Sequence, residues 1–498
     1  MRESGILFPI FSLPSKFGVG SFSREAYEFV DFLEKSGQGF WQILPVGPTG
    51  YGNSPYQPFS AFAGNPYFIS PEVLIEEGLL TWDECNACDF GKDEERVDYG
   101  ALYENRFTLL KKAHVRFKEN KEEQKAYKKF IEKESFWLND YALFKAIKDS
   151  KGGASWLDWE DGLKKRDEKE LENAKKELSD EIDFVIFCQY EFDKQWNKLR
   201  KYANDKNVKI IGDLPFYVSL DSSDAWSHPE VFQMDKNLEP KVVAGCPPDA
   251  FSATGQLWGN PIYDWKALKK SGYDWWVRRM ERNYEFYDVI RIDHFHGFCE
   301  YYAIPYGSQT AEKGKHEKGP GMDFFDVLKT KIKELRIIAE DLGNNTPENE
   351  KLLKDTGFPG MKVLQYRFTS WDSYYVNHRH INNCVVYTGT HDNTPTRAWV
   401  EEINDGERDF ARRYINSLNS DYGQLVWDII REAYRSVADL CIIPLQDYLC
   451  KGREARINSP GTAEGNWQWR LKPNFLSDEL SRAIRGLTEL YSRIPKGE

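Results

Sequence analysis

Several short apolar stretches of this 498-residue chain end on ionisable side chains. The stretch YDVIRIDHFHGF (287–298) leads from apolar residues into an arginine, an aspartate and two histidines. Three other stretches share the pattern: VKIIGD ends on Asp213, RIIAED on Glu340 and Asp341, and CVVYTGTHD on His391 and Asp392. One strand-end aspartate is as often the N-cap of the next helix, but four strand ends with carboxylates favour a common site.

Several carboxylates in one cleft, without an obvious Ser or Cys triad, are typical of glycosidic chemistry. A retaining mechanism needs one carboxylate as nucleophile and another as general acid/base, about 5–5.5 Å apart. Arg291 precedes Asp293 by two residues and shares its strand face, which predicts a lowered pKa for Asp293. The apolar residues before Glu340 predict a raised pKa for that carboxyl. Asp341 points to the other side of its strand and is expected to cap a helix or anchor a loop.

Eight short apolar runs carry these residues and predict the elements that position them. Continuous apolar runs without alternation indicate a parallel sheet buried on both faces. Helical patterns lie between most runs; one, at 23–37, places Ala26, Phe29, Val30 and Leu33 on one face. The fold class is therefore α/β, a (β/α)8 TIM barrel, in which chemistry gathers at the C-terminal strand ends. The runs lie near 5–10, 39–46, 208–213, 287–293, 336–341, 361–366, 384–392 and 441–447.

Two intervals between these runs are too long for simple crossovers. Residues from about 65 to 205 read as mostly helical and predict a helical insertion subdomain. Residues from about 215 to 285 are rich in Gly, Pro and Trp and predict a loop-rich insertion that covers the active-site cleft. We expect residues 1–498 to form a single catalytic barrel carrying these two insertions.

Composition and charge indicate which partners and which cellular compartment to expect. The formal net charge is −12, which argues against nucleic acid and against an anionic membrane surface. No apolar run reaches the roughly 18 residues needed to span a membrane, and the N-terminal residues lack the features of a signal peptide. Eight scattered cysteines are typical of buried free thiols, so we expect a cytoplasmic protein.

Metal and cofactor readings fit the sequence poorly. The CNAC motif (85–88) has the spacing of a zinc site, but no second Cys or His pair accompanies it. The HFH motif (294–296) would need further ligands, of which only His391 is available. The GVGSF stretch (18–22) lacks the third glycine of a dinucleotide-binding loop. We expect no metal and no cofactor.

A series of motifs carries a family resemblance over almost the whole chain. In order, they are YGNSPYQPFSAFAGNP, IGDLPFYV, PPDAFSATGQLWGNP, RIDHFHGF, IAEDLG, GFPGMKVLQY, GTHDNTPTR and RINSPGT with NWQWR. The chain closely resembles the 4-α-glucanotransferases (amylomaltases) of glycoside hydrolase family 77. The resemblance implies retaining transfer of an α-1,4-glucan segment to the 4-OH of an acceptor glucan or glucose. The partners it implies are α-1,4-glucans: maltooligosaccharides, amylose, and starch- or glycogen-derived chains.

The same resemblance assigns roles residue by residue. Asp293 would be the nucleophile, Glu340 the general acid/base and Asp392 the stabiliser of the transition state. The implied substrate-binding residues are Tyr56, Asp213, Asp249, Gln256, Trp258, Arg291, His294, His391, Asn458 and Asn466. Asp249, Gln256 and Trp258 belong to the loop expected over the cleft.

Two rival functions use the same residues. An α-amylase-like hydrolase would have the same three carboxylates with water as the acceptor. A catalytically silent glucan-binding protein would keep the aromatic residues, which make up 15% of the chain, and could lose a carboxylate. The products formed from maltotriose distinguish all three.

Overall fold

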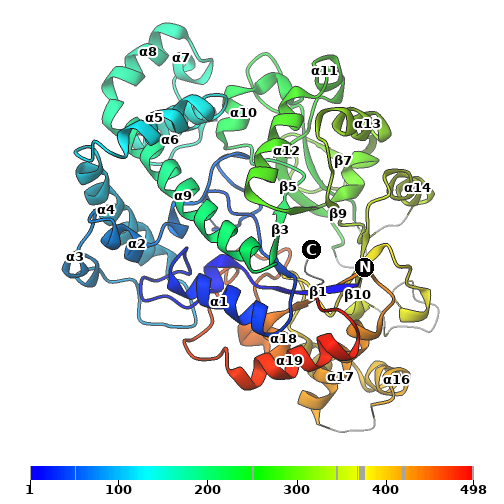
Figure 1. The fold of residues 1–498 in the computed structure, drawn as a ribbon. Helices are drawn as coiled ribbons and strands as arrows, with labels where there is room; N and C mark the ends of the chain where they lie inside the picture. The colour runs from blue at the N-terminus through cyan, green and yellow to red at the C-terminus, as the bar shows by residue number, and fades with distance from the viewer. Residues whose placement is uncertain are drawn as a thin grey trace.

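The computed structural model of this protein describes residues 2–50, 52–248, 252–343, 346–366, 368, 376–417 and 421–495. Its centre is a closed barrel of eight parallel strands (Figure 1), which confirms the predicted (β/α)8 fold. Each predicted apolar run supplies one strand. Around the barrel the order is β1 (Glu3–Leu7), β12 (Leu440–Pro444), β11 (Cys384–Tyr387), β10 (Gly360–Val363), β9 (Ile337–Ala339), β6 (Val289–Ile292), β3 (Lys209–Leu214) and β2 (Phe40–Gln42).

Apolar side chains fill the barrel. One buried cluster takes at least one residue from each of seven strands, and Val289 of the eighth packs against it. Alternate residues of a strand face opposite sides, so Met361 and Val363 of β10 point inward while Lys362 between them points outward. The cluster comprises Leu7, Phe40, Ile211, Ile338, Met361, Val363, Val385, Tyr387 and Ile442.

The strand register brings the polar strand ends together. Asp213 of β3 lies beside Arg291 of β6, and Ile292 lies beside Ala339 of β9. The ladder continues one residue beyond the strands, because the backbone N–H of Asp293 donates to Leu214 O and that of Glu340 donates to Ile292 O, both at 3.0 Å. Asp213, Asp293 and Glu340 therefore leave neighbouring strands at one rim of the barrel.

Helices surround the barrel and build the interval between β2 and β3. The helix predicted at 23–37 is α1 (Arg24–Lys35), which buries Ala26, Phe29, Val30 and Leu33 as predicted. Between β2 and β3 come α2 (Pro71–Glu76), α3 (Trp82–Asn86), α4 (Tyr99–Phe117), α5 (Gln124–Lys133), α6 (Leu138–Ser150), α7 (Asp161–Lys164), α8 (Glu168–Glu177) and α9 (Ser179–Asp205). The division of the chain into a barrel and insertions stays a prediction.

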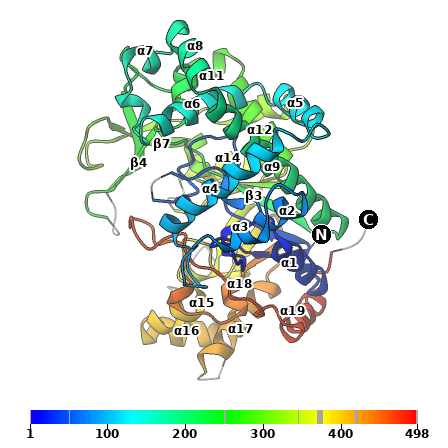
Figure 2. The same cartoon turned by 90° about the vertical axis from the view of Figure 1, so that its left-hand side faces the viewer.

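The remaining helices follow β3. They are α10 (Ser223–Ser227), α11 (Trp265–Lys270), α12 (Asp274–Phe286), α13 (Met322–Lys331), α14 (Pro347–Thr356), α15 (Thr396–Glu402), α16 (Asp405–Ile415), α17 (Tyr422–Arg435), α18 (Leu445–Tyr448) and α19 (Asp478–Leu490). Figures 1 and 2 show α5 to α8 at one end of the molecule and α16, α17 and α19 at the other. Within the described ranges, no helix has the length and apolar character to cross a membrane.

A second sheet, which the sequence analysis did not predict, lies outside the barrel. It is antiparallel, in the order β5 (Gln256–Pro261), β4 (Val242–Cys246), β7 (Glu300–Pro305) and β8 (Lys315–Lys318). Strands β4 and β5 arise within the interval expected to be loop-rich, and β7 follows the strand end that carries Asp293. This sheet brings Gln256 and Trp258 toward the barrel rim.

Candidate active site

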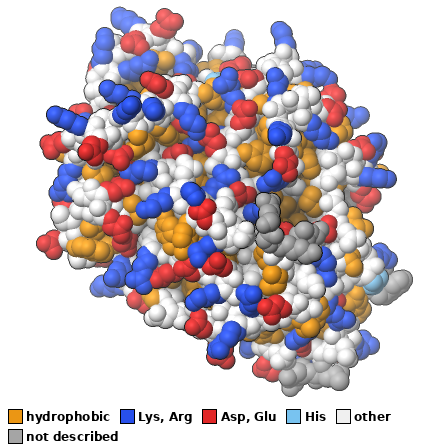
Figure 3. All heavy atoms as spheres, viewed as in Figure 1, with side chains coloured by type: hydrophobic (Ala, Val, Ile, Leu, Met, Phe, Trp, Pro, Cys, Tyr) orange, Lys and Arg blue, Asp and Glu red, His pale blue; other side chains and the backbone are white. Residues whose placement is uncertain are grey.

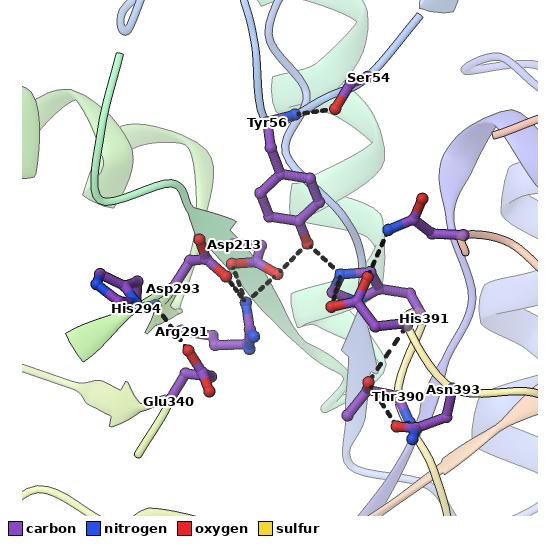
Figure 4. Close-up of polar contacts among 12 residues, drawn as sticks. Ser54, Tyr56, Asp213, Arg291, Asp293, His294, Glu340, Thr390, His391 and Asn393 are labelled. Atoms are coloured by element: carbon purple, nitrogen blue, oxygen red, sulfur yellow. Dashed lines mark hydrogen bonds and ion pairs between the residues drawn. The ribbon is translucent and has the colours of Figure 1, made fainter. Parts of the chain in front are cut away.

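A chain of hydrogen bonds links Tyr56, Asp213, Arg291 and Asp293 (Figure 4). Arg291 Nη1 lies 2.7 Å from both carboxylate oxygens of Asp213 and 3.3 Å from Asp293 Oδ1. The Tyr56 hydroxyl donates to Asp213 Oδ2 at 2.8 Å. Arg291 and Asp293 therefore share a strand face as predicted, and one buried guanidinium joins two carboxylates from neighbouring strands.

The pKa predicted for Asp293 was wrong in direction. Burial raises the pKa of Asp293 to about 6, and the charges of Asp213 and Asp392 act in the same direction. Arg291 lowers this pKa but does not outweigh the loss of hydration. The sequence pattern revealed the arginine but not the depth at which the carboxyl lies.

Two backbone N–H groups hold the Glu340 carboxylate. His294 N donates to Oε2 at 2.8 Å, and Leu342 N donates to Oε1 at 3.1 Å. His294 has φ 49° and ψ 47°, a left-handed conformation that few non-glycine residues adopt. Burial raises the pKa of Glu340 to about 7, as the apolar lead-in predicted, and the nearby Asp293 charge raises it further. Glu340 thus keeps its proton to higher pH than Asp293.

Asp392 has the opposite character. Burial would raise its pKa, but His391 and a hydrogen bond from Asn458 hold the pKa of this carboxyl well below its usual range. His391 Nε2 lies 3.2 Å from Asp392 Oδ2 and 2.8 Å from the Tyr56 hydroxyl, and Asn458 Nδ2 donates to Asp392 Oδ1 at 2.6 Å. Asp392 therefore stays ionised where Glu340 is protonated.

Aromatic rings line the approach to these groups. The Trp258 ring stands edge-on to His294, with centroids 5.2 Å apart, and its Nε1 donates to Gln256 Oε1 at 3.1 Å. The Tyr56 ring stacks on His391 at a centroid distance of 5.2 Å. Flat apolar faces beside carboxylates suit the C–H faces and hydroxyls of a sugar.

The other predicted residues have different surroundings. Asn466 accepts a hydrogen bond from Ser459 N and donates to Thr462 O, so it shapes its own loop. Asp249 lies outside the described residues. Among the described residues, no group of three or more His, Cys, Asp or Glu side chains is arranged to hold a metal ion.

Sequence reasoning missed two residues at the site. Arg456 donates to Asp392 O at 3.0 Å and to Thr394 Oγ1 at 2.7 Å, which fixes the strand end that carries Asp392. The Trp467 ring lies near both Tyr56 and His391, at 5.7 and 6.2 Å between centroids. Both residues belong to the C-terminal motifs RINSPGT and NWQWR, which were the available signal.

Known proteins resemble this chain over almost its whole length. A family model described as 4-alpha-glucanotransferase, glycoside hydrolase family 77, matches residues 8–477. The chain belongs to this family. A 4-alpha-glucanotransferase of Clostridium butyricum is 49% identical over 487 residues, which cover 97% of this chain and 99% of the relative. One from Thermus thermophilus is 43% identical over 505 residues and 99% of each chain.

A solved family 77 structure has the same fold. The amylomaltase from Streptococcus agalactiae in complex with acarbose superimposes with a TM-score of 0.97 at 40% identity, over 99% of this chain and 100% of that one. Membership in family 77 confirms the resemblance and identifies the chain as an enzyme whose activity is 4-alpha-glucanotransfer.

Proposed function

We propose that this family 77 enzyme transfers an α-1,4-glucan segment with retention, using Asp293 as nucleophile and Glu340 as general acid/base. The observation that supports the proposal is the pairing of the Asp293 and Glu340 carboxyls, which differ in pKa. Two partly buried carboxyls leave adjacent strands, and the pKa of Glu340, about 7, lies above that of Asp293, about 6. A carboxylate and a carboxylic acid in one cleft are what the first step of a retaining mechanism requires.

In the first step, Asp293 attacks the anomeric carbon of the donor glucan. The bond from that carbon to the glycosidic oxygen breaks, and Glu340 transfers its proton to that oxygen. The reducing-end part leaves with a free 4-OH, and a covalent glycosyl-enzyme ester remains on Asp293. Backbone donors from His294 and Leu342 hold Glu340 in place for the transfer.

In the second step, Glu340 takes the proton of an acceptor 4-OH. The acceptor oxygen attacks the anomeric carbon, and the ester bond to Asp293 breaks. A glucan or glucose acceptor yields a longer chain, whereas water would yield hydrolysis. Transfer is favoured when the site is covered and water is poorly positioned, and β4 with β5, which bring Trp258 to His294, supply cover on one side.

The surrounding residues bind and orient the sugar. We assign Asp392, kept ionised by His391 and Asn458, to the hydroxyls of the distorted ring and to the positive charge of the transition state. Arg291 orients Asp293 and favours its ionised form. Tyr56, Asp213, His294, His391, Gln256 and Trp258 are proposed to contact the glucan, together with Asp249 and Asn466.

The substrates we propose are maltooligosaccharides, amylose, and chains derived from starch or glycogen. The net charge of −12 and the mixture of acidic and basic side chains over the face in Figure 3 support a sugar rather than nucleic acid or a membrane as partner. All eight cysteines are free thiols, which supports a reducing, cytoplasmic location.

The test is to incubate the pure enzyme with maltotriose, without metal or nucleotide, and to separate the products while counting reducing ends. We expect glucose and a ladder of longer maltooligosaccharides at a constant number of reducing ends. Shorter sugars with rising reducing ends would make the enzyme a hydrolase. Bound but unchanged maltotriose would indicate a silent binding protein. Asp293→Asn and Glu340→Gln serve as inactive controls.

A further inference from the structure

One buried ion pair adjoins the site without a part in the mechanism above. Asp341 and Lys362 are 5% and 4% exposed, and Lys362 Nζ lies 3.5 Å from Asp341 Oδ2. The other oxygen, Asp341 Oδ1, accepts a hydrogen bond from Met361 N at 2.7 Å. Burying two charges costs free energy unless their geometry and hydrogen bonds compensate, so the contribution of this pair to stability alone does not explain its presence.

The pair lies next to Glu340, on the side of the backbone opposite to the Glu340 carboxyl. Asp341 follows Glu340 in the chain, and Lys362 points outward from β10, the strand beside β9. Gly360 provides the space, because a Cβ there would come within 2.5 Å of Asp341 Oδ2. Consecutive residues are thus fixed from opposite sides: Glu340 by backbone N–H groups at the barrel rim, and Asp341 by β10.

We propose that the Asp341–Lys362 ion pair positions Glu340. The pair holds the backbone next to Glu340 in place, and its charges act on the Glu340 carboxyl. The inference rests on the proposed role of Glu340 as general acid/base. The sequence analysis expected Asp341 only to cap a helix or anchor a loop. In this proposal Asp341 also positions Glu340, and Lys362 acts on the reaction indirectly, through Asp341 and Glu340.

Charged and titratable groups face Glu340 from several elements. Arg291 and Asp293 reach it from β6, His294 precedes η5 (Phe295–Phe298), and Tyr366 ends η6 (Leu364–Tyr366). Burial is the main reason that the pKa of Glu340 is raised, Arg291 lowers it, and Asp293 and Asp341 raise it. Removing the Asp341 charge while Lys362 keeps its own should therefore make Glu340 ionise at lower pH.

The deciding experiment is the pH dependence of kcat/KM for maltotriose in Asp341→Asn. The acid must be protonated for the first step, so the rate falls as pH rises through the Glu340 pKa. We expect this alkaline limb to move to lower pH by about half a pH unit, because the variant loses a negative charge that favours the protonated acid but contributes less than Arg291 or Asp293. An alkaline limb identical to the wild type in folded Asp341→Asn would overturn the inference.

Two controls accompany this variant. Asp288→Asn removes a carboxylate that pairs with Arg200 at 2.6 Å. Asp288 directly precedes β6, at the end of the strand opposite to Asp293. This variant should lower thermal stability in the same way but leave the alkaline limb in place. Glu340→Gln separates the two proposals: if it stays active, the role of Glu340 is wrong, and if it is inactive while Asp341→Asn has a wild-type profile, only the pair is wrong.

A cavity allows a second test of Lys362. Asp341 and Lys362 both line a cavity of about 420 Å³ beside α14, and the lining includes Ile381, which is 62% exposed. Lys362→Ala should lose about tenfold in activity, and added n-propylammonium, which matches the atoms missing beyond Cβ, should restore several-fold of the lost activity with saturation. The same amine should not rescue Asp341→Asn. A folded Lys362→Ala variant with wild-type activity, or one that the amine leaves unchanged, would contradict the part assigned to Lys362.

Discussion

We expect two partly buried carboxyls with raised pKa values to set the pH range in which this enzyme works. In the proposed mechanism, Asp293 is protonated below about pH 6 and could not attack, and Glu340 above about pH 7 would have lost the proton that it donates. We expect a bell-shaped profile of kcat/KM against pH, with limbs near these two values. The measurement is initial glucose release from maltotriose between pH 4.5 and 9. A profile flat across that range would contradict the assignment.

Replacing the proposed nucleophile, Asp293, separates the loss of chemistry from a loss of binding. Asp293→Asn keeps the shape of the side chain but not its nucleophilicity, so transfer should fall by at least about a thousandfold. Acarbose, held by the related amylomaltase, should still raise the melting temperature of the variant. Asp405→Asn, at a fully exposed side chain in α16, is the matched control and should keep full activity. Wild-type turnover in Asp293→Asn would refute its role.

At this scale the sequence predicted which residues lie near one another better than it predicted their contacts and pKa values. The motifs named Asp293, Glu340 and Asp392, and the apolar run before Glu340 indicated its raised pKa. They did not reveal that Arg291 bonds mainly to Asp213, because that contact depends on the register of β3 against β6. The sequence also could not predict the raised pKa of Asp293, because the burial that raises it depends on residues distant in the chain.

The barrel strands depend on close approach at a few positions. A Cβ on Gly212 of β3 would come within 2.1 Å of the Tyr287 ring, and Tyr287 is itself only 2% exposed. We expect Gly212→Ala to lower the free energy of unfolding by about 2 kcal/mol or more, because the buried ring cannot move away. Urea denaturation followed by circular dichroism measures the loss.

A second glycine provides the contrast. Gly486 lies inside α19, and a Cβ there meets no atom within 4 Å apart from the neighbouring backbone of its own helix. Gly486→Ala should therefore raise stability by about 0.5–1 kcal/mol, since alanine favours the helix. Equal effects of the two substitutions would show that the crowding at Gly212 does not matter.

Elements differed in how clearly the sequence revealed them. The eight barrel strands are short and apolar, so composition and spacing predicted each one. The second sheet escaped notice because two of its four strands lack that signal: β5 reads QLWGNP, and β8 reads KHEK and is exposed at all four positions. Their pairing partners, β4 and β7, lie far apart in the chain.

At the scale of the whole molecule, one arginine ties the end of the described chain to its beginning. Arg493 is 0% exposed and donates to Tyr434 O, Ser436 O and Glu3 O at 2.8 to 3.0 Å. Tyr434 lies in the last turn of α17, Ser436 follows that helix, and Glu3 begins β1. The contacts hold the first strand and the last helix of the described chain to the rest of the barrel.

Arg493→Met should destabilise the enzyme without changing its chemistry. Charge-assisted hydrogen bonds are lost and buried carbonyls lose a donor, so we expect a loss of about 2–4 kcal/mol in the free energy of unfolding. Activity at a temperature where the variant is folded should stay at the wild-type level. Arg413→Met, at a side chain 73% exposed, should change stability by less than about 0.5 kcal/mol. A wild-type melting temperature in Arg493→Met would contradict this account.

The closed barrel offers no free strand edge, but the outer sheet ends on β8. That strand reads Lys-His-Glu-Lys, and every one of its side chains faces solvent. An open edge of unpaired backbone groups is a template on which another chain can add a strand. Positive charges along such an edge repel an identical edge on a second molecule, so β8 opposes the stacking of copies into fibrils at high protein concentration.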